Sequence, residues 1–96
     1  MTGGTGHIEA AIKSHPLCAR IILFLIEHEH AMDTVQGVAR CWVNSDEIAV
    51  KSALDRLLAV GVLSSQSLSS GTYYSLTPHA KVRAWLKAEQ QRFAFS

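Results

Sequence analysis

The sequence predicts a mainly α-helical domain with a small β-hairpin, in the order α-α-α-α-β-β-α. Residues 45–63 place apolar side chains at helical spacing and then reach a glycine, a residue that commonly ends helices. Residues 17–29 are apolar on nearly every side, which is typical of a helix surrounded by others. Residues 62–68 and 72–76 flank a Ser-Ser-Gly sequence, and this pattern indicates two strands joined by a tight turn.

The composition is that of a single small folded domain. The 96 residues are 48% hydrophobic, and 9 Lys and Arg side chains against 8 Asp and Glu give a net charge of +1. This balance provides no general attraction to nucleic acid or to an anionic membrane, so any electrostatic argument must be local. Because a small domain buries a low fraction of its apolar surface, we expect the chain to form a homodimer.

The sequence carries no signal for export or for membrane insertion. The first residues lack the basic and apolar regions of a signal peptide, and the apolar run at residues 21–26 is far shorter than the ~20 residues that span a bilayer. Cys18 and Cys41 lie within apolar helical patterns, where reduced thiols behave as small hydrophobes, and the fold does not require a disulfide between them. We therefore expect a cytoplasmic protein.

The elements follow one another along a single domain at residues 7–93. Residues 1–6 precede it, and their three glycines without apolar periodicity predict a flexible tail. A helix is expected where apolar residues recur three and four positions apart, and a strand where short apolar runs flank turn residues. These rules predict helices at residues 7–13, 17–29, 34–43, 46–60 and 79–93, and a hairpin at residues 62–76.

Capping residues mark the starts of the helices. Pro16 suits the first turn of the second helix, and Thr34 is the cap candidate of the third. Asn44 or Ser45 can cap the fourth, and Asn44 with Glu47 has the spacing of a capping box. Because only two residues separate the third and fourth helices, we expect a tight helix-turn-helix.

The helix at residues 46–60 has two distinct faces. One arc is apolar and should pack against the core, whereas the other is mostly polar and should face solvent or a partner. The apolar arc holds Val50, Ala53, Leu54, Leu57 and Leu58. The presented arc holds Ile48, Lys51, Ser52, Asp55, Arg56 and Ala59.

A family resemblance rests on four segments, SHPLCARIILFL, TVQGVARCWVN, VKSALDRLLAVGVL and GTYYSLTPHAKVRAWL. They span about four-fifths of the chain and resemble successive parts of winged helix-turn-helix transcriptional regulators of the arsenical-repressor (ArsR-like) and multiple-antibiotic-resistance (MarR-like) types. The most specific pieces are the pattern Leu54, Leu57, Gly61, Leu63 and the run Tyr74, Leu76, Thr77, Pro78. Both describe packing, so the resemblance indicates the fold and extends to function by analogy.

The resemblance implies a small dimeric DNA-binding transcriptional regulator. In such families the fourth helix enters the major groove, the hairpin forms a wing against the flanking backbone, and the terminal helices hold the dimer. Carried over to this chain, the candidate DNA contacts are Gln36, Ile48, Lys51, Ser52, Arg56, Ser69 and Ser70, with Gly71 also at the wing tip. The candidate dimer contacts are Ile8, Ile12, Val82, Trp85, Leu86 and Phe93. The expected partners are double-stranded DNA and a second copy of the chain.

The charge of these segments leaves a second interpretation open. Three basic and three acidic side chains cancel over residues 34–76, and the hairpin has no basic residue. Neutralising phosphates supplies most of the non-specific affinity for DNA, and a presented Ile48 also suits a protein partner. The alternative is a winged-helix protein-protein interaction module without DNA binding.

The second alternative is a metal or redox sensor of the same fold. It would use Cys18, Cys41 or the polar group His28, Glu29, His30 and Asp33. The spacing does not favour metal binding, because two histidines two positions apart on a helix end diverge, and the paired-cysteine motif of such sensors is absent. We expect buried thiols and no metal.

Enzyme activity is not expected. The sequence has no Gly-rich phosphate loop, nucleophile elbow or zinc-binding HExxH motif, and a small helical core leaves little room for a cleft or cofactor. Trp42 and Trp85 lie on apolar stripes and fit core or interface positions. The basic residues of the last helix fit a solvated face.

Overall fold

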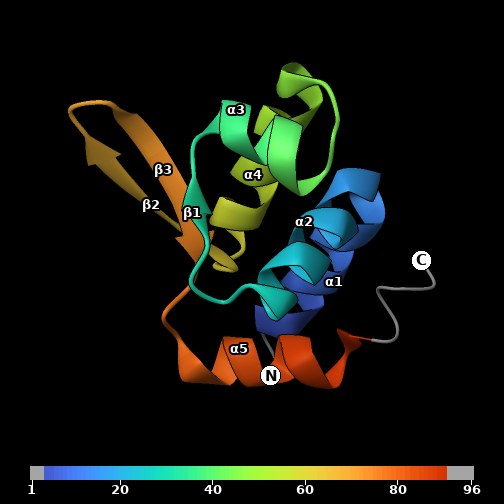
Figure 1. Ribbon diagram of the computed structural model, residues 1–96. Helices are drawn as coiled ribbons and strands as arrows, with labels where there is room; N and C mark the ends of the chain where they lie inside the picture. Colours follow the sequence, from blue (N-terminus) through green and yellow to red (C-terminus); the bar gives the residue numbers. More distant parts are fainter. Residues whose placement is uncertain (1–3, 91–96) are drawn as a thin grey trace.

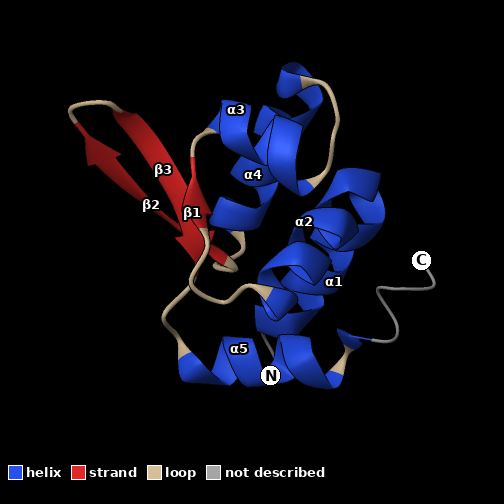
Figure 2. Cartoon of the chain, viewed as in Figure 1, coloured by secondary structure: helices blue, strands red, loops and turns tan. Residues whose placement is uncertain are grey.

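The computed structural model describes residues 4–90 and shows a mostly helical chain with a small antiparallel sheet. Figures 1 and 2 show the helices grouped into one body, with the β2–β3 hairpin projecting from one side and α5 lying across one end. This arrangement confirms the predicted mainly α-helical class with a β-hairpin. In chain order the elements are α1 (Gly4–Ser14), α2 (Pro16–Glu27), β1 (Met32–Asp33), α3 (Val35–Gly37), the π-helix η1 (Val38–Trp42), α4 (Glu47–Ala59), β2 (Leu63–Leu68), β3 (Gly71–Leu76) and α5 (Ala80–Ala88).

The sheet has a strand that the sequence did not predict. The strand order is β1-β3-β2, so the short β1 pairs with β3 on the side opposite to β2. Met32 lies opposite Ser75, and Asp33 lies opposite Tyr74. A strand of two residues is too short to show the alternation of apolar and polar residues by which strands are recognised, which explains why it was missed.

The hairpin forms at the predicted place. Its pairs run from Leu63 opposite Leu76 to Leu68 opposite Gly71, and the turn consists of Ser69 and Ser70. The inner end of the hairpin is buried, because Leu63 is 5% exposed and Leu76 is 4% exposed. The outer end projects beyond the helices (Figure 1).

Two of the predicted helix starts are confirmed. Pro16 lies in the first turn of α2, where His15 Nδ1 accepts a hydrogen bond from Leu17 N at 3.3 Å. Thr34 caps α3, since its Oγ1 accepts from Gly37 N at 3.3 Å.

The cap of α4 differs from the prediction. Asp46 is the N-cap, and its Oδ2 accepts from Ala49 N at 3.0 Å. Asn44 instead occupies the left-handed region with φ 49°, a conformation that Asn tolerates better than most residues, and it turns the chain between η1 and α4. The capping box of Asn44 with Glu47 is therefore wrong, because Asn44 lies two residues before the cap.

The predicted helix at residues 34–43 forms in two parts, of which the second is a π-helix. Val43 N donates to Val38 O at 3.2 Å across this wide turn, and Arg20 of α2 also donates to Val43 O. A residue turns through a smaller angle in a π-helix than in an α-helix, so side chains assigned by α-helical spacing are displaced around the axis. Cys41, predicted to be buried, is consequently exposed.

The end of α4 is a Schellman motif, as the position of Gly61 suggested. Gly61 has φ 81°, its N–H donates to Leu58 O at 3.1 Å, and Val62 N donates to Leu57 O at 3.0 Å. Glycine adopts this left-handed conformation without steric cost. The motif reverses the chain so that Val62 returns directly into the core, where it is 0% exposed.

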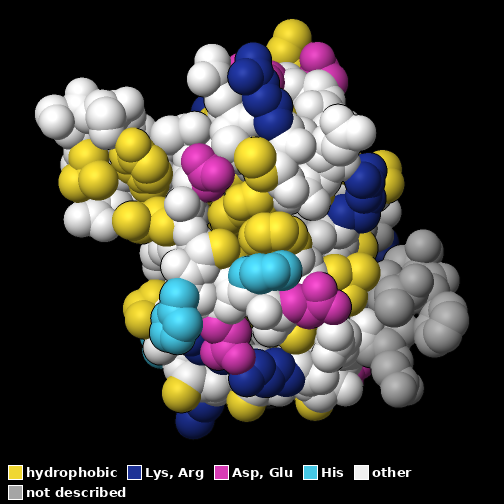
Figure 3. Space-filling view, viewed as in Figure 1, with side chains coloured by type: hydrophobic (Ala, Val, Ile, Leu, Met, Phe, Trp, Pro, Cys, Tyr) yellow, Lys and Arg dark blue, Asp and Glu magenta, His cyan; other side chains and the backbone are white. Residues whose placement is uncertain are grey.

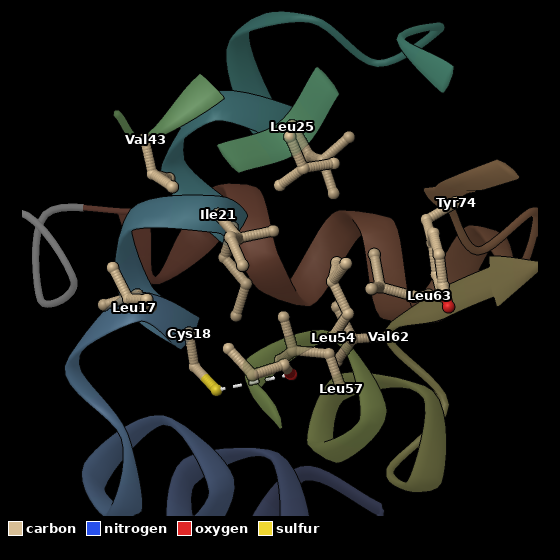
Figure 4. Packing of buried hydrophobic residues seen from close by; sticks show 14 of the residues in the cluster. Leu17, Cys18, Ile21, Leu25, Val43, Leu54, Leu57, Val62, Leu63 and Tyr74 are labelled. Carbon is tan, nitrogen blue, oxygen red and sulfur yellow. Dashed lines mark hydrogen bonds between the residues drawn. The ribbon is translucent and has the colours of Figure 1, made fainter. Parts of the chain in front are cut away.

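One hydrophobic core joins the helices to the sheet. The central helix α2 contacts α1, α4 and α5, and its Ile21, Ile22 and Leu25 are fully buried. Figure 4 shows side chains of α2 and α4 facing one another beside Leu63 and Tyr74 of the sheet. On α4 the predicted apolar arc is confirmed, since Val50, Ala53, Leu54 and Leu57 are buried and Leu58 is half-buried.

The ends of the chain differ in extent from the prediction. Helix α1 begins at Gly4, inside the segment 1–6 expected to be a tail. Helix α5 spans Ala80–Ala88, and the predicted helix end at residue 93 lies outside the described residues. Residues 1–3 and 91–96 lie outside the described part of the chain. Between residues 4 and 90, no helix has the length and apolar character needed to cross a bilayer.

Candidate functional site

The exposed face of α4 forms the central part of the candidate site. Ile48 is 81% exposed, although large apolar side chains are usually covered, and Lys51, Ser52 and Asp55 are also exposed. The core packing of the opposite face fixes this orientation, and the Asp46 cap fixes where the helix begins. The predicted presented arc of α4 is thus confirmed, with Arg56 and Ala59 exposed as well.

A hollow of about 370 Å³ lies beside this face, between α3, α4 and the hairpin. It brings together Gln36 from α3, Lys51 from α4 and Ser70 from the hairpin turn. These three candidate contacts come from separate parts of the sequence, and the fold places them around one open surface. The remaining lining residues are Thr34, Val35, Gly71, Thr72 and Tyr74.

Sequence reasoning missed the contributions of Thr34, Thr72 and Tyr74 to this hollow. The sequence pattern indicates Thr34 only as a helix cap and Tyr74 only as an apolar residue of the hairpin. Their position depends on the contact between β3 and α3, which is a long-range property without a local signal in the sequence. Gly71, predicted at the tip of the hairpin, borders the same hollow.

Lys51 is the basic residue of the hollow, and its charge is already paired. Its Nζ lies 2.8 Å from Oδ1 and 2.9 Å from Oδ2 of Asp55, one helical turn further along α4. The hydrogen bond from Lys51 to the Asp55 carboxylate raises the pKa of Lys51 above its ordinary value. Both side chains are about half exposed, so water screens the pair and a competing anion can exchange with the carboxylate.

Arg56 does not belong to this hollow. Its guanidinium donates to Ser14 Oγ at 3.1 Å, and it lines a separate depression against α1 with Ala10, Ala11, Ala59 and Val60. Arg56 lies in the last turn of α4, where α1 packs alongside. Lys51 and Arg56 are thus both exposed on α4, but they border different depressions.

The hairpin turn carries hydroxyl groups but no charge. Ser69 and Ser70 are exposed, and Ser70 Oγ lies 2.8 Å from Tyr73 Oη in a hydrogen bond. Residues 57–77 contain no Asp, Glu, Lys or Arg. Figure 3 shows the projecting hairpin without blue or magenta side chains, while elsewhere on this face basic and acidic residues are interspersed.

Three of the six candidate dimer contacts are core residues. Ile8 is 2% exposed, Ile12 is 7% exposed and Leu86 is fully buried, all within the chain's own core. Val82 and Trp85 are half-buried against that core, and Phe93 lies outside the described residues. Ile8, Ile12 and Leu86 are therefore covered within the chain itself, and of this set only the half-buried Val82 and Trp85 keep exposed surface among the described residues.

The polar group at the end of α2 has structural partners. His28 Nδ1 lies 3.0 Å from Phe24 O in a hydrogen bond, and the His28 ring stacks on Phe24 with centroids 4.3 Å apart. Phe24 also stacks on Trp42, with ring centroids 4.7 Å apart, so the three rings form a partly exposed column.

Glu29 connects the α2–β1 loop to α5. Its carboxylate lies 3.3 Å from Arg83 Nη1 and also contacts Lys87 Nζ. The hydrogen bond from Lys87 lowers the pKa of Glu29, and Arg83 adds to the effect. Within residues 4–90, no group of three or more His, Cys, Asp or Glu side chains is arranged to hold a metal ion.

The two cysteines have different environments. Cys18 is fully buried, its Sγ lies 3.8 Å from Ala53 O (Figure 4), and burial raises its pKa to about 11. Cys41 is exposed, and both thiols are free. The prediction of a buried thiol is confirmed for Cys18 and wrong for Cys41.

Comparison of the chain with protein-family models, with curated proteins and with solved structures found no match.

Proposed function

We propose that the chain is a small DNA-binding transcriptional regulator with a winged helix-turn-helix. In this proposal α3 and η1 form the first helix of the motif, α4 is the recognition helix, and the β2–β3 hairpin is the wing. The observation that supports it best is the hollow that places Gln36, Lys51 and Ser70 together beside the exposed face of α4. Helix and hairpin then lie on the same side, as a duplex requires.

The residues around the hollow suit both the bases and the backbone of DNA. Ile48 lies in the first turn of α4, the part of a recognition helix that reaches base edges, and its methyl groups fit against a thymine methyl. Gln36 can accept from and donate to an adenine edge. Lys51 and Ser70 offer an ammonium and a hydroxyl to phosphates.

Few cations support this interface, so binding should be weak and its salt dependence shallow. Lys51 must exchange Asp55 for a phosphate, and the acidic Asp46 and Glu47 lie close by at the helix start. Each phosphate contact adds about one to the salt slope through counterion release, so with few such contacts the affinity should fall only modestly between low salt and about 0.15 M.

Three variants test the assignment in a fluorescence-anisotropy titration with a labelled mixed-sequence duplex at low and physiological salt. Lys51→Ala should weaken binding and lower the salt slope by about one, because one phosphate contact is lost. Asp55→Asn keeps the size of the side chain but frees Lys51, and should tighten binding by about two- to fivefold. Arg56→Ala removes the same charge as Lys51→Ala from a residue that faces α1, and is the matched control.

The wild type failing to bind the duplex at low salt would reject the regulator. Equal losses in the Lys51→Ala and Arg56→Ala variants would show that net charge, and not the hollow, governs binding.

A winged-helix protein-interaction module is the second candidate, and the exposure of Ile48 favours it. An apolar side chain that is 81% exposed within a charge-balanced surface resembles the anchor of a protein interface. The same titration separates the two candidates, because an interaction module should show no salt-dependent binding to duplex DNA.

A further inference from the structure

Strand β2 is an open edge of the sheet. Among residues 4–90 it pairs with β3 on one side only, since the strand order is β1-β3-β2. In an antiparallel ladder, alternate residues direct their N–H and C=O groups to opposite sides, so about half of the β2 backbone groups point away from β3. Residues 65–68 are exposed, and Figure 1 shows β2 on the outer side of the projecting hairpin.

This edge lacks the features by which proteins usually prevent edge-to-edge pairing. Such edges typically carry lysines, prolines or inward-pointing charges, or they are covered by another element. Residues 57–77 contain no charged residue and no proline, although the chain as a whole has 18% charged residues. Nothing of like charge therefore opposes another strand that approaches β2.

The side chains of the edge are complementary to themselves. Between Ser64 and Leu68 they are hydroxyls and one carboxamide, apart from the terminal leucine. Hydroxyl and carboxamide groups both donate and accept hydrogen bonds, so identical groups can pair across a two-fold axis. A partner of different sequence would be selected by charge or by apolar pockets, and this edge offers no charge.

We propose that β2 pairs with β2 of a second copy in antiparallel orientation, about a two-fold axis at Gln66, the centre of the exposed stretch. Gln66 then lies opposite Gln66 of the partner subunit, and Ser65 lies opposite the partner's Ser67. In this register the facing residues have side chains on the same face of the sheet, as antiparallel pairing requires. The two three-stranded sheets join into one, and Leu68, which is 45% exposed, gains a neighbour in the partner's Ser64.

This interface differs from one built on the terminal helices, whose apolar residues pack within the chain's own core. The proposed dimer interface uses only strand β2, so its test is independent of the test for DNA binding.

Reciprocal charge substitutions at Gln66 test both the surface and the register by sedimentation equilibrium on the full chain. Gln66→Lys and Gln66→Glu each place two like charges opposite one another, and each should weaken dimerisation by about fivefold or more. An equimolar mixture of the two variants should restore the dimer, because opposite charges then face each other. Ser52→Lys adds a charge on the exposed face of α4 and should leave the dimer unchanged.

A cysteine variant provides an independent measurement of the register. Cys41→Ser first removes the exposed native thiol, and Gln66→Cys is then added. Directly opposite residues have Cα atoms about 4.5–5.5 Å apart, which suits a disulfide, so mild oxidation should yield a covalent dimer on a non-reducing gel. The matched Ser52→Cys variant should remain a monomer on that gel.

A wild type that stays monomeric over the concentration series would overturn the proposal. So would a dimer that both Gln66 charge variants leave intact, since its interface would then lie elsewhere.

Discussion

At the scale of single residues, the partners of each charge determine what the surface can bind. Lys51 is paired with Asp55, Arg83 and Lys87 are paired with Glu29, and Arg56 contacts Ser14. The sequence shows these charges but not their partners, because only the i,i+4 pair on α4 is local. The candidate DNA contacts therefore had to be separated by the structure into Lys51, beside the hollow, and Arg56, against α1.

The two thiols should react very differently with iodoacetamide. The thiolate is the reactive form. Cys18 is fully buried, and burial raises its pKa to about 11, so its thiolate is scarce near neutral pH. Cys41 should be alkylated in the folded protein near neutral pH, whereas Cys18 should react only after unfolding. Mass spectrometry of peptides after a time course of labelling measures both sites.

Cys41→Ser is the matched variant for this experiment, and it should leave the folded chain unlabelled. Rapid labelling of the Cys41→Ser protein under native conditions would contradict the buried position of Cys18.

At the scale of elements, α4 was the most predictable part of the chain. Its apolar and presented arcs follow directly from the helical period, and the structure confirms both. Its start was less predictable, because Asn44, Ser45 and Asp46 are all good caps and the choice depends on how the preceding turn closes. The π-helical turn of η1 and the two-residue β1 have no sequence pattern of their own, so neither was anticipated.

The Schellman motif at the end of α4 should make Gly61 sensitive to substitution. Gly61→Ala places a Cβ on a residue with φ 81°, where no atom obstructs it, so the cost is conformational and should be about 1 kcal/mol in the free energy of unfolding. A lower urea midpoint with an unchanged m value would show this loss.

Gly61→Asn is the control for backbone conformation, because Asn tolerates the left-handed region better than Ala does. We expect it to be less destabilising than Gly61→Ala, although its side chain is larger. The reverse order would indicate that size, and not φ, determines the cost at this position.

At the scale of the whole molecule, apolar patterns predict which helix faces are buried, but not whether the same chain or a second chain buries them. Ile8, Ile12 and Leu86 form stripes that suit a dimer interface as well as a core, and the structure assigns them to the core. A sequence cannot separate these two outcomes, because burial by the same chain and burial by a second chain select the same side chains. The uncharged stretch at residues 57–77 is visible in the sequence, but its importance depends on β2 being an edge strand.

The DNA proposal depends on one side of the molecule, formed by α3, α4 and the hairpin, while α1 and α5 lie elsewhere around the body (Figure 1). Weak binding to DNA can also arise from basic residues elsewhere on the surface, such as those of α5. The position of contact is therefore more informative than affinity alone.

The most direct test maps that position by NMR, as amide chemical-shift changes on adding a mixed-sequence duplex at low salt. We expect changes at Gln36, Lys51, Ser52 and Ser70 that diminish as salt is raised, with little change along α5. Changes concentrated on α5, or none at any of these positions, would contradict the assignment of α4 and the hairpin as the DNA-binding surface.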